Sequence, residues 1–354
     1  MRALSTETFA RPSLDAEHSS RKVFELQRER TEVKFEIWSR SRNSVLLVLT
    51  AIFEALVVIA LEAVIFEKFK PFSKKELGTG IPVYLIIFIL SQVFQVALAW
   101  DAVRAQNTIQ VIALLLFNLC CFGYAVFQFK QIFKALDAYT EISAQVLRQL
   151  IEHLLIVNAV ITGVCQLIYF YLGARLYQEF GWRIYKKIGA DPEIRNMYRW
   201  YQILLTILKL DIFFFLGYSI QYLVLVLKNN DSEFPLTITA LPLTCLFLIL
   251  TVYAVRREST PLVLLVFLGL AAGCAYFIFK ICRMYQPDQE YKYVYVNEFL
   301  TFFASVSLLL VVLTIINVAI CWRNFHKGLK PHLLRDHRTS SLTHNPGERT
   351  LSLD

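Results

Sequence analysis

Long runs of apolar residues alternate with short charged stretches along most of the chain. Each run is about as long as the roughly 20 residues that an α-helix needs to cross the hydrocarbon core of a bilayer. The runs lie at residues 44–66, 81–100, 109–129, 154–175, 201–227, 236–255, 261–281 and 298–322. This pattern predicts an all-α, polytopic bundle of about eight transmembrane helices, in which residues 44–322 form the membrane domain.

The number of spans depends on the short polar break between the sixth and seventh runs. Arg256, Arg257 and Glu258 lie in this break, shortly before Pro261. Charged side chains are costly in lipid, and proline suits the first turn of a new helix, so the break predicts a tight hairpin between two spans. A count of seven spans is the alternative.

Composition agrees with a membrane protein. Of the 354 residues, 56% are hydrophobic and only 18% are charged, and the mean hydropathy is +0.49. Soluble domains contain about 45–50% apolar residues, and their charges are not confined to gaps between apolar runs. The formal net charge of +8 fits basic loops held on the cytosolic side of a membrane, and no nucleic-acid partner is expected.

The charge distribution also predicts the orientation. An even number of spans places both termini on one side, and more Lys and Arg residues lie near the membrane on that side than on the other. The positive-inside rule then places both termini in the cytosol. Residues 1–43 form a charged arm, either partly helical or solvated, and residues 323–354 form a basic, mostly disordered tail. The basic loop 176–200 is cytosolic in this topology and is expected to contact anionic lipid.

Charged residues within the apolar runs are the main candidates for function, because ionised groups are expensive in lipid. They are Glu54 and Glu62 in the first run, and Lys209 and Asp211 in the fifth. With a rise of about 1.5 Å per residue, Glu54, Lys209 and Asp211 lie at similar depth, which predicts an ion pair between Glu54 and Lys209. Two interpretations remain open: a pair that only fixes helix packing, or a proton or ion site that uses the surplus carboxylate.

Amide side chains also occur within the runs. Such groups most often form hydrogen bonds between helices, and lining a substrate path is the alternative. They are Gln92, Gln95, Asn118, Asn158, Gln166, Gln221 and Asn317.

Three residues are predicted to shape helix packing. Pro242 removes a backbone hydrogen bond within the sixth run and should kink that helix. Gly269 and Gly273 form a GxxxG pattern in the seventh run, which allows two helix backbones to approach closely. Packing within the bundle is the default interpretation of this pattern, and homodimer formation is the alternative.

Two positions are candidates for covalent modification. Asn230 lies in an Asn-x-Ser sequon on the predicted lumenal side, close to the end of the fifth run. Cys321 lies beside the cytosolic edge of the last run and is a palmitoylation candidate. The seven cysteines lie in or beside apolar runs, which does not fit a disulfide framework, and the histidines have no metal-binding spacing, so neither a metal nor a cofactor is expected.

Two classes of function fit these features, and a third is disfavoured. The first is a transporter of a small solute, ion or proton; four spans per half would make parallel repeats with charged residues in matching places. The second is a non-catalytic scaffold or cargo-sorting factor. A seven-span receptor is disfavoured, because the Asp/Glu-Arg-Tyr and Asn-Pro-x-x-Tyr patterns are missing. An enzyme is not expected either, since the chain has no HExxH, GxSxG or phosphate-binding glycine motif.

Two blocks of the chain resemble a known family. One is the segment from Arg199 to Tyr218, with the sequence RWYQILLTILKLDIFFFLGY, and the other runs from Thr301 to Pro331 and ends in CWRNFHKGLKP. The chain resembles the uncharacterised fungal family of Golgi-apparatus membrane proteins over residues 35–331. The resemblance implies a multi-pass protein in the Golgi membrane, and it implies no reaction, substrate or site residues.

Overall fold

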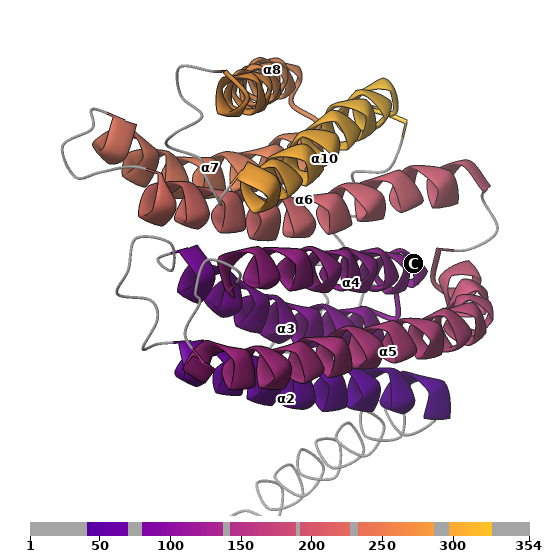
Figure 1. Ribbon diagram of the computed structural model, residues 1–354. Coiled ribbons are helices and arrows are strands. Elements are labelled where there is room, and N and C mark those ends of the chain that lie inside the picture. The colour runs from indigo at the N-terminus through magenta and orange to yellow at the C-terminus, as the bar shows by residue number, and fades with distance from the viewer. Residues whose placement is uncertain are drawn as a thin grey trace, which may run out of the picture.

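The computed structural model describes residues 41–69, 80–136, 142–188, 192–226, 233–286 and 297–327. All regular secondary structure in these ranges is helical, which confirms the predicted all-α class. Each of the eight predicted runs corresponds to a separate helix (Figure 1). The helices are α2 (Arg42–Phe69), α3 (Gly80–Ala105), α4 (Thr108–Leu136), α5 (Ile142–Ile188), α6 (Pro192–Leu225), α7 (Glu233–Arg257), α8 (Thr260–Met284) and α10 (Asn297–Arg323).

Seven of these helices are long and apolar enough to cross a membrane, judged on the residues that the structure describes. The exception is α7, so its crossing stays a prediction. α7 and α8 each contain 25 residues and are joined through Glu258 and Ser259. Glu258 has a positive φ of 52°, and Pro261 lies in the first turn of α8. The tight turn between two helices that was predicted at this break is therefore confirmed, whereas the crossing of the membrane by both helices stays a prediction.

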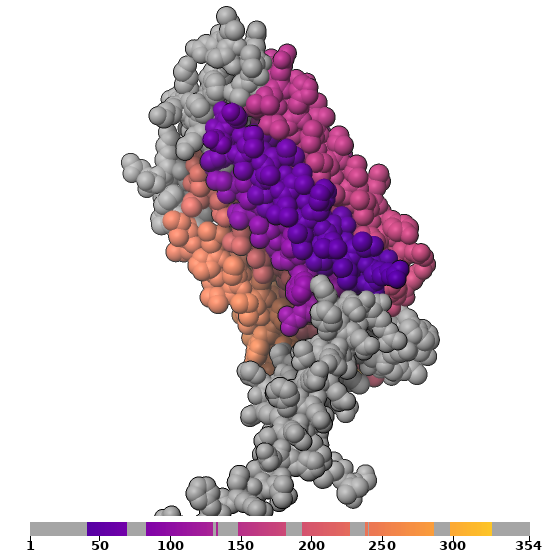
Figure 2. Space-filling model, turned by 90° about the horizontal axis from the view of Figure 1, so that it is seen from below, coloured from indigo at the N-terminus to yellow at the C-terminus, as the bar shows by residue number. Residues whose placement is uncertain are grey.

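The helices form two groups of four that follow one another along the chain (Figure 1). In each group every helix packs against the next, and the last helix closes on the first: α5 packs against α2, and α10 packs against α6. Figure 2 shows α2 and α5 side by side on the outer face of the first group. The two groups, here called the N-terminal half and the C-terminal half, meet mainly where α6 lies against α3 and α4.

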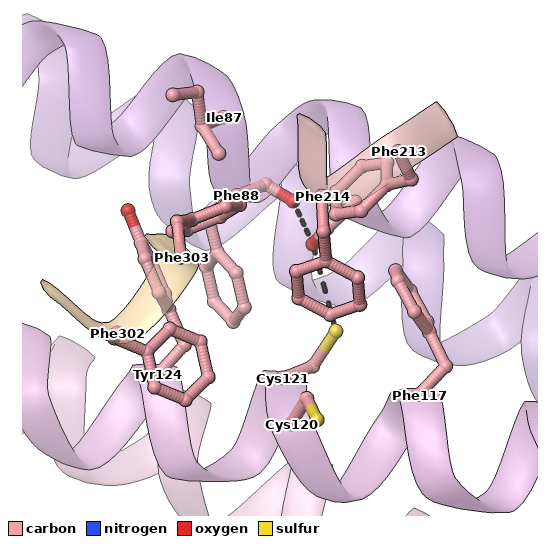
Figure 3. Close-up of a pocket in the computed structure, with 11 residues that line it drawn as sticks. Ile87, Phe88, Phe117, Cys120, Cys121, Tyr124, Phe213, Phe214, Phe302 and Phe303 are labelled. Carbon is pink, nitrogen blue, oxygen red and sulfur yellow. Dashed lines mark hydrogen bonds between the residues drawn. The ribbon is translucent and has the colours of Figure 1, made fainter. Parts of the chain in front are cut away.

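Aromatic rings fill the centre of the contact between the halves. The ring centroids of Phe94 and Phe213 are 4.8 Å apart and stacked, and those of Phe214 and Phe303 are 5.7 Å apart. We call this group the aromatic seam; its members are Phe94, Phe117, Tyr124, Phe213, Phe214 and Phe303. Figure 3 shows side chains from α3, α4, α6 and α10 converging there around a void of only about 20 Å³. The seam is therefore almost completely packed.

Large apolar side chains cover the outside of the bundle. Leu56, Leu167 and Leu268 are each at least 66% exposed, and each belongs to a different helix. Exposed apolar surface of this kind is costly in water but suits the hydrocarbon region of a bilayer. The burial pattern thus agrees with a polytopic membrane protein.

The predicted basic loop 176–200 is mostly helical, which corrects the sequence interpretation. α5 continues to Ile188 and α6 begins at Pro192, so only residues 189–191 lie outside the described residues. The prediction placed a loop here because the segment is polar. A polar segment can extend a helix beyond the bilayer until residues such as Gly189 and Pro192 interrupt it, and α5 accordingly has 47 residues.

Both glycines of the GxxxG pattern contact neighbours within the chain. A Cβ atom at Gly269 would lie 2.2 Å from the ring of Phe247 in α7, whereas one at Gly273 would lie 4.0 Å from Val311 in α10. Gly269 therefore provides the space that the Phe247 ring occupies. Pro242 lies inside α7, and the helix continues through it.

Several predictions concern residues that the structure does not describe. The arm 1–43, apart from its last three residues, lies outside the described ranges, as do residues 328–354 and the sequon residue Asn230. Cys321 is described: it is buried, and its Sγ lies 3.5 Å from Oδ1 of Asn317. A buried thiol is not accessible to an acyl donor, which argues against its palmitoylation.

Candidate functional site

Glu54 lies at the middle of α2 and is completely buried. Its Oε2 atom accepts hydrogen bonds from Nε2 of Gln95 in α3 and from the hydroxyl of Tyr169 in α5, both at 2.7 Å. The same Gln95 nitrogen lies 3.2 Å from the Tyr169 oxygen. Among the described residues, the hydrogen-bond partners of this carboxyl group are therefore neutral.

Glu62 lies about two turns further along α2 and is also completely buried. Its two carboxyl oxygens are bound by amides from the helices opposite. Nδ2 of Asn158 in α5 donates to Oε1 at 2.6 Å, and Nε2 of Gln128 in α4 donates to Oε2 at 2.9 Å. At about 1.5 Å per residue, the two glutamates are separated by about 12 Å along the helix.

Further buried amides lie in the interior of the N-terminal half. Asn118 donates from Nδ2 to Oε1 of Gln166 at 2.9 Å, and Gln92 in α3 is also buried. We call the whole set the polar column; its members are Glu54, Glu62, Gln92, Gln95, Asn118, Gln128, Asn158, Gln166 and Tyr169.

Many oxygen atoms of the polar column have no hydrogen-bond partner among the residues that the structure describes. An unpaired buried polar atom costs about 1–3 kcal/mol, so a row of them requires an explanation. The oxygens are Oε1 of Glu54, Gln92, Gln95 and Gln128, and Oδ1 of Asn118 and Asn158. Amide and carboxyl oxygens are acceptors, which suits protons carried by water or a small hard cation. Two amide nitrogens of the column, Nε2 of Gln92 and Nε2 of Gln166, are unpaired as well, so the column offers donors in addition to a majority of acceptors.

Asp211 occupies a related position in the C-terminal half. It lies in α6, is 5% exposed, and accepts a hydrogen bond of 2.9 Å at Oδ2 from the hydroxyl of Thr314 in α10. Glu54 and Asp211 thus both lie on the first helix of their half and both accept a hydroxyl hydrogen bond from the last helix. This is the matching placement that two parallel repeats would produce.

The predicted ion pair between Glu54 and Lys209 is wrong. Nζ of Lys209 pairs instead with Oδ2 of Asp101, near the end of α3, and the two side chains are 38% and 42% exposed. Residues that are two positions apart in an α-helix point in directions about 200° apart around the helix axis. Lys209 therefore faces the other half, whereas Asp211 faces α10. The prediction used depth alone and ignored this rotation.

Lys280, near the end of the seventh predicted run, is a buried cation that was not among the candidate residues. It lies in α8 and is 5% exposed. Its Nζ donates to the hydroxyl of Tyr222 at 2.7 Å and lies 4.1 Å from the centroid of the Tyr222 ring and 5.6 Å from that of Tyr276. Tyr276 lies one turn before Lys280 in the same helix. An aromatic residue at this spacing can bind the lysine through a cation–π contact, and the sequence could have indicated the buried position of Lys280 in this way.

A cavity of about 830 Å³ separates the two halves on the side of the bundle where α3 ends and α4 and α6 begin. We call it the vestibule. Its lining includes Arg195 and Arg199 from the start of α6, and aliphatic residues from α4, α6 and α10. The aromatic seam continues from its inner end: Phe117 follows Leu116 in α4, and Phe213 lies one turn after Leu210 in α6. The vestibule is therefore closed by the seam toward the other side of the bundle.

The comparisons with known proteins identify one relative. A UPF0658 Golgi apparatus membrane protein from Schizosaccharomyces pombe is 30% identical to the chain over an alignment of 336 positions, which covers 86% of this chain and 95% of the relative. No family model matches the chain, and no solved structure matches it. The aligned region includes nearly the whole relative, and it confirms the resemblance noted in the sequence. The chain belongs to the UPF0658 family of Golgi apparatus membrane proteins.

Proposed function

We propose that this protein is a proton-coupled transporter of the Golgi membrane, in which Glu54 and Glu62 bind and release protons. The Golgi location follows the name of the fission-yeast relative. The positive-inside rule supports a topology with both termini in the cytosol and α7 as the eighth span. The proposal assigns no enzymatic reaction to the chain.

The observation that carries the proposal is the pair of buried carboxyl groups in a row of neutral amides. In the interior of a membrane bundle a carboxylate without a counter-charge is expensive. A carboxyl group in such a place is favoured in its neutral, protonated form when water is excluded, and it can release the proton when water reaches it. The unpaired oxygens of the polar column supply further acceptors in the same half of the bundle. A purely structural role would need only satisfied hydrogen bonds.

The arrangement of the two halves supports transport as well. Transporters built from repeats move one half against the other around a site between them. Here the contact between the halves includes a vestibule open on one side, the aromatic seam, the Asp101–Lys209 ion pair and the Asn107–Gln202 hydrogen bond. A rotation of one half against the other would therefore require only that side-chain contacts between the halves break and form again.

The test is proton flux into vesicles that contain the purified full-length protein. An imposed pH gradient should drive uptake by the unchanged protein, and Glu54→Gln and Glu62→Gln should each abolish it. Glu67→Gln is the matched control, because it makes the same chemical change at an exposed position of α2. Flux that survives both buried substitutions contradicts the proposal. If the unchanged protein shows no flux with any ion or metabolite, the alternative of a non-catalytic scaffold or cargo-sorting factor is favoured.

A further inference from the structure

The mouth of the vestibule is positively charged. Arg195 and Arg199 lie one turn apart on α6, and both line the cavity. Arg199 is exposed and Arg195 is half-buried. The N-terminus of α4, with its first backbone N–H groups, lies at the same end, where Oδ1 of Asn107 accepts a 3.0 Å hydrogen bond from the backbone N–H of Ile109. A helix N-terminus adds to the positive potential of two guanidinium groups.

Neutral polar groups line the next level of the cavity. Nδ2 of Asn107 donates to Oε1 of Gln202 at 2.9 Å, and Nε2 of Gln202 donates to the hydroxyl of Tyr198 at 2.8 Å. This chain of hydrogen bonds connects α4 to α6 beneath the arginines. No acidic side chain belongs to the lining formed by the described residues. The described residues of the lining therefore give the mouth a positive charge.

The deeper part of the vestibule is aliphatic. Its lining comes from three helices and consists of Ile109, Ile112, Ala113, Leu116, Ile203, Ile207, Leu210, Leu310 and Leu313. Ile112 and Leu116 are 46% and 55% exposed, so this part is open toward the surface that faces the acyl chains. The volume of about 830 Å³ is within the range of about 300–1,000 Å³ that is usual for ligand sites.

From this division between a cationic mouth and an aliphatic interior we infer that the vestibule binds an anionic phospholipid. The phosphate lies at Arg195 and Arg199, and one acyl chain lies between α4, α6 and α10. A water-soluble anion would match the mouth but would leave the aliphatic lining without a partner. A neutral lipid would match the lining but would gain nothing from the arginines. This site is separate from the polar column and does not depend on proton transport.

The experiment uses the full-length protein in phosphatidylcholine vesicles that contain a trace of phosphatidylserine with a photoactivatable acyl chain. Labelling should map to peptides of α4 and α6. The double substitution Arg195→Gln/Arg199→Gln should reduce labelling about tenfold, because each cation near an anionic lipid contributes. Arg257→Gln is the matched control; it removes an exposed arginine at the end of α7, outside the vestibule, and should leave labelling unchanged.

A second variant tests the position of the acyl chain. Ile207→Trp fills the aliphatic part and should also reduce labelling of α4, while both arginines remain. Three results would overturn the inference: equal labelling by a photoactivatable phosphatidylcholine, labelling that the double arginine variant retains, and competition by water-soluble glycerophosphoserine as effective as that by the lipid. Labelling should persist in Glu54→Gln, so failure of this site and failure of proton transport are distinguishable.

Discussion

The hydroxyl of Tyr169 donates a 2.7 Å hydrogen bond to the carboxyl group of Glu54 and so connects the last helix of the N-terminal half to the first. Both side chains are completely buried. Asp211 and Thr314 make the corresponding contact in the C-terminal half, at 2.9 Å. Each half is thus closed by a hydrogen bond between a buried carboxyl group and a hydroxyl group.

Tyr169→Phe removes the hydroxyl and keeps the ring. Because Oε1 of Glu54 already has no partner, weakening the contacts of Oε2 should lower the free energy of unfolding by about 1–3 kcal/mol. The measurement is thermal unfolding of the purified protein in detergent. Tyr171→Phe, at an exposed position of the same helix, should have little effect. Equal losses in the two variants would show that the hydrogen bond to Glu54 contributes nothing.

Thr314→Val should destabilise the C-terminal half by a similar amount, about 1–3 kcal/mol, since it leaves Asp211 without its hydroxyl donor. Thr314→Ser is the control, because it keeps the donor and removes only a methyl group. Thermal unfolding of both variants distinguishes the loss of the hydrogen bond from the loss of packing. A larger effect of the serine variant would contradict the assigned contact.

Lys209 should couple energetically to Asp101 and not to Glu54. In a double-mutant cycle, Lys209→Met and Asp101→Asn should show an interaction energy of about 1 kcal/mol or less, as expected for a partly exposed pair. Lys209→Met combined with Glu54→Gln should be additive. Unfolding free energies of the single and double variants decide the matter. Coupling to Glu54 instead would restore the prediction made from depth alone.

Gly269→Ala and Gly273→Ala should behave differently although they belong to one GxxxG pattern. A Cβ atom at Gly269 overlaps the Phe247 ring, so this variant should lose about 1–3 kcal/mol of stability, whereas Gly273 has room for a methyl group. Phe247→Leu should recover part of the loss when combined with Gly269→Ala. If Gly273→Ala is the more harmful change and also shifts the protein from dimer to monomer in detergent, the homodimer interpretation is correct.

Tags at both termini should be cleaved by protease from the cytosolic face of intact Golgi vesicles, because eight spans return the chain to the side where it started. The C-terminal tag would be protected if only seven helices cross. Among the described helices, α7 is the one that is not long and apolar enough to count as a span. A cysteine-accessibility scan along residues 241–257 tests directly whether it crosses the membrane. Solvent-accessible cysteines throughout this segment would exclude α7 as a span.

Among the described residues, the eight apolar helices and the hairpin at Glu258 were determined by the sequence itself. In every span, exposing a charge or an unpaired backbone group to lipid has the same high cost. The order of apolar and polar residues along the chain is therefore sufficient to locate the helices. The buried state of Glu54, Glu62 and Asp211 follows from the same cost. The helical extension of α5 and α6 through 176–200 could not be predicted from the sequence in this way. Outside the bilayer, the polarity of a segment no longer distinguishes a helix from a loop.

Tertiary structure alone decided which side chains meet. Depth along a helix can be counted from the sequence, but rotation about each helix axis depends on how all the neighbours pack. Lys209 therefore meets Asp101 although Glu54 lies at similar depth, and Gly269 meets Phe247 although a second copy of the helix would fit the same pattern. The vestibule arises in the same way. It combines one face each of α4, α6 and α10, and these faces become neighbours only when the two halves associate.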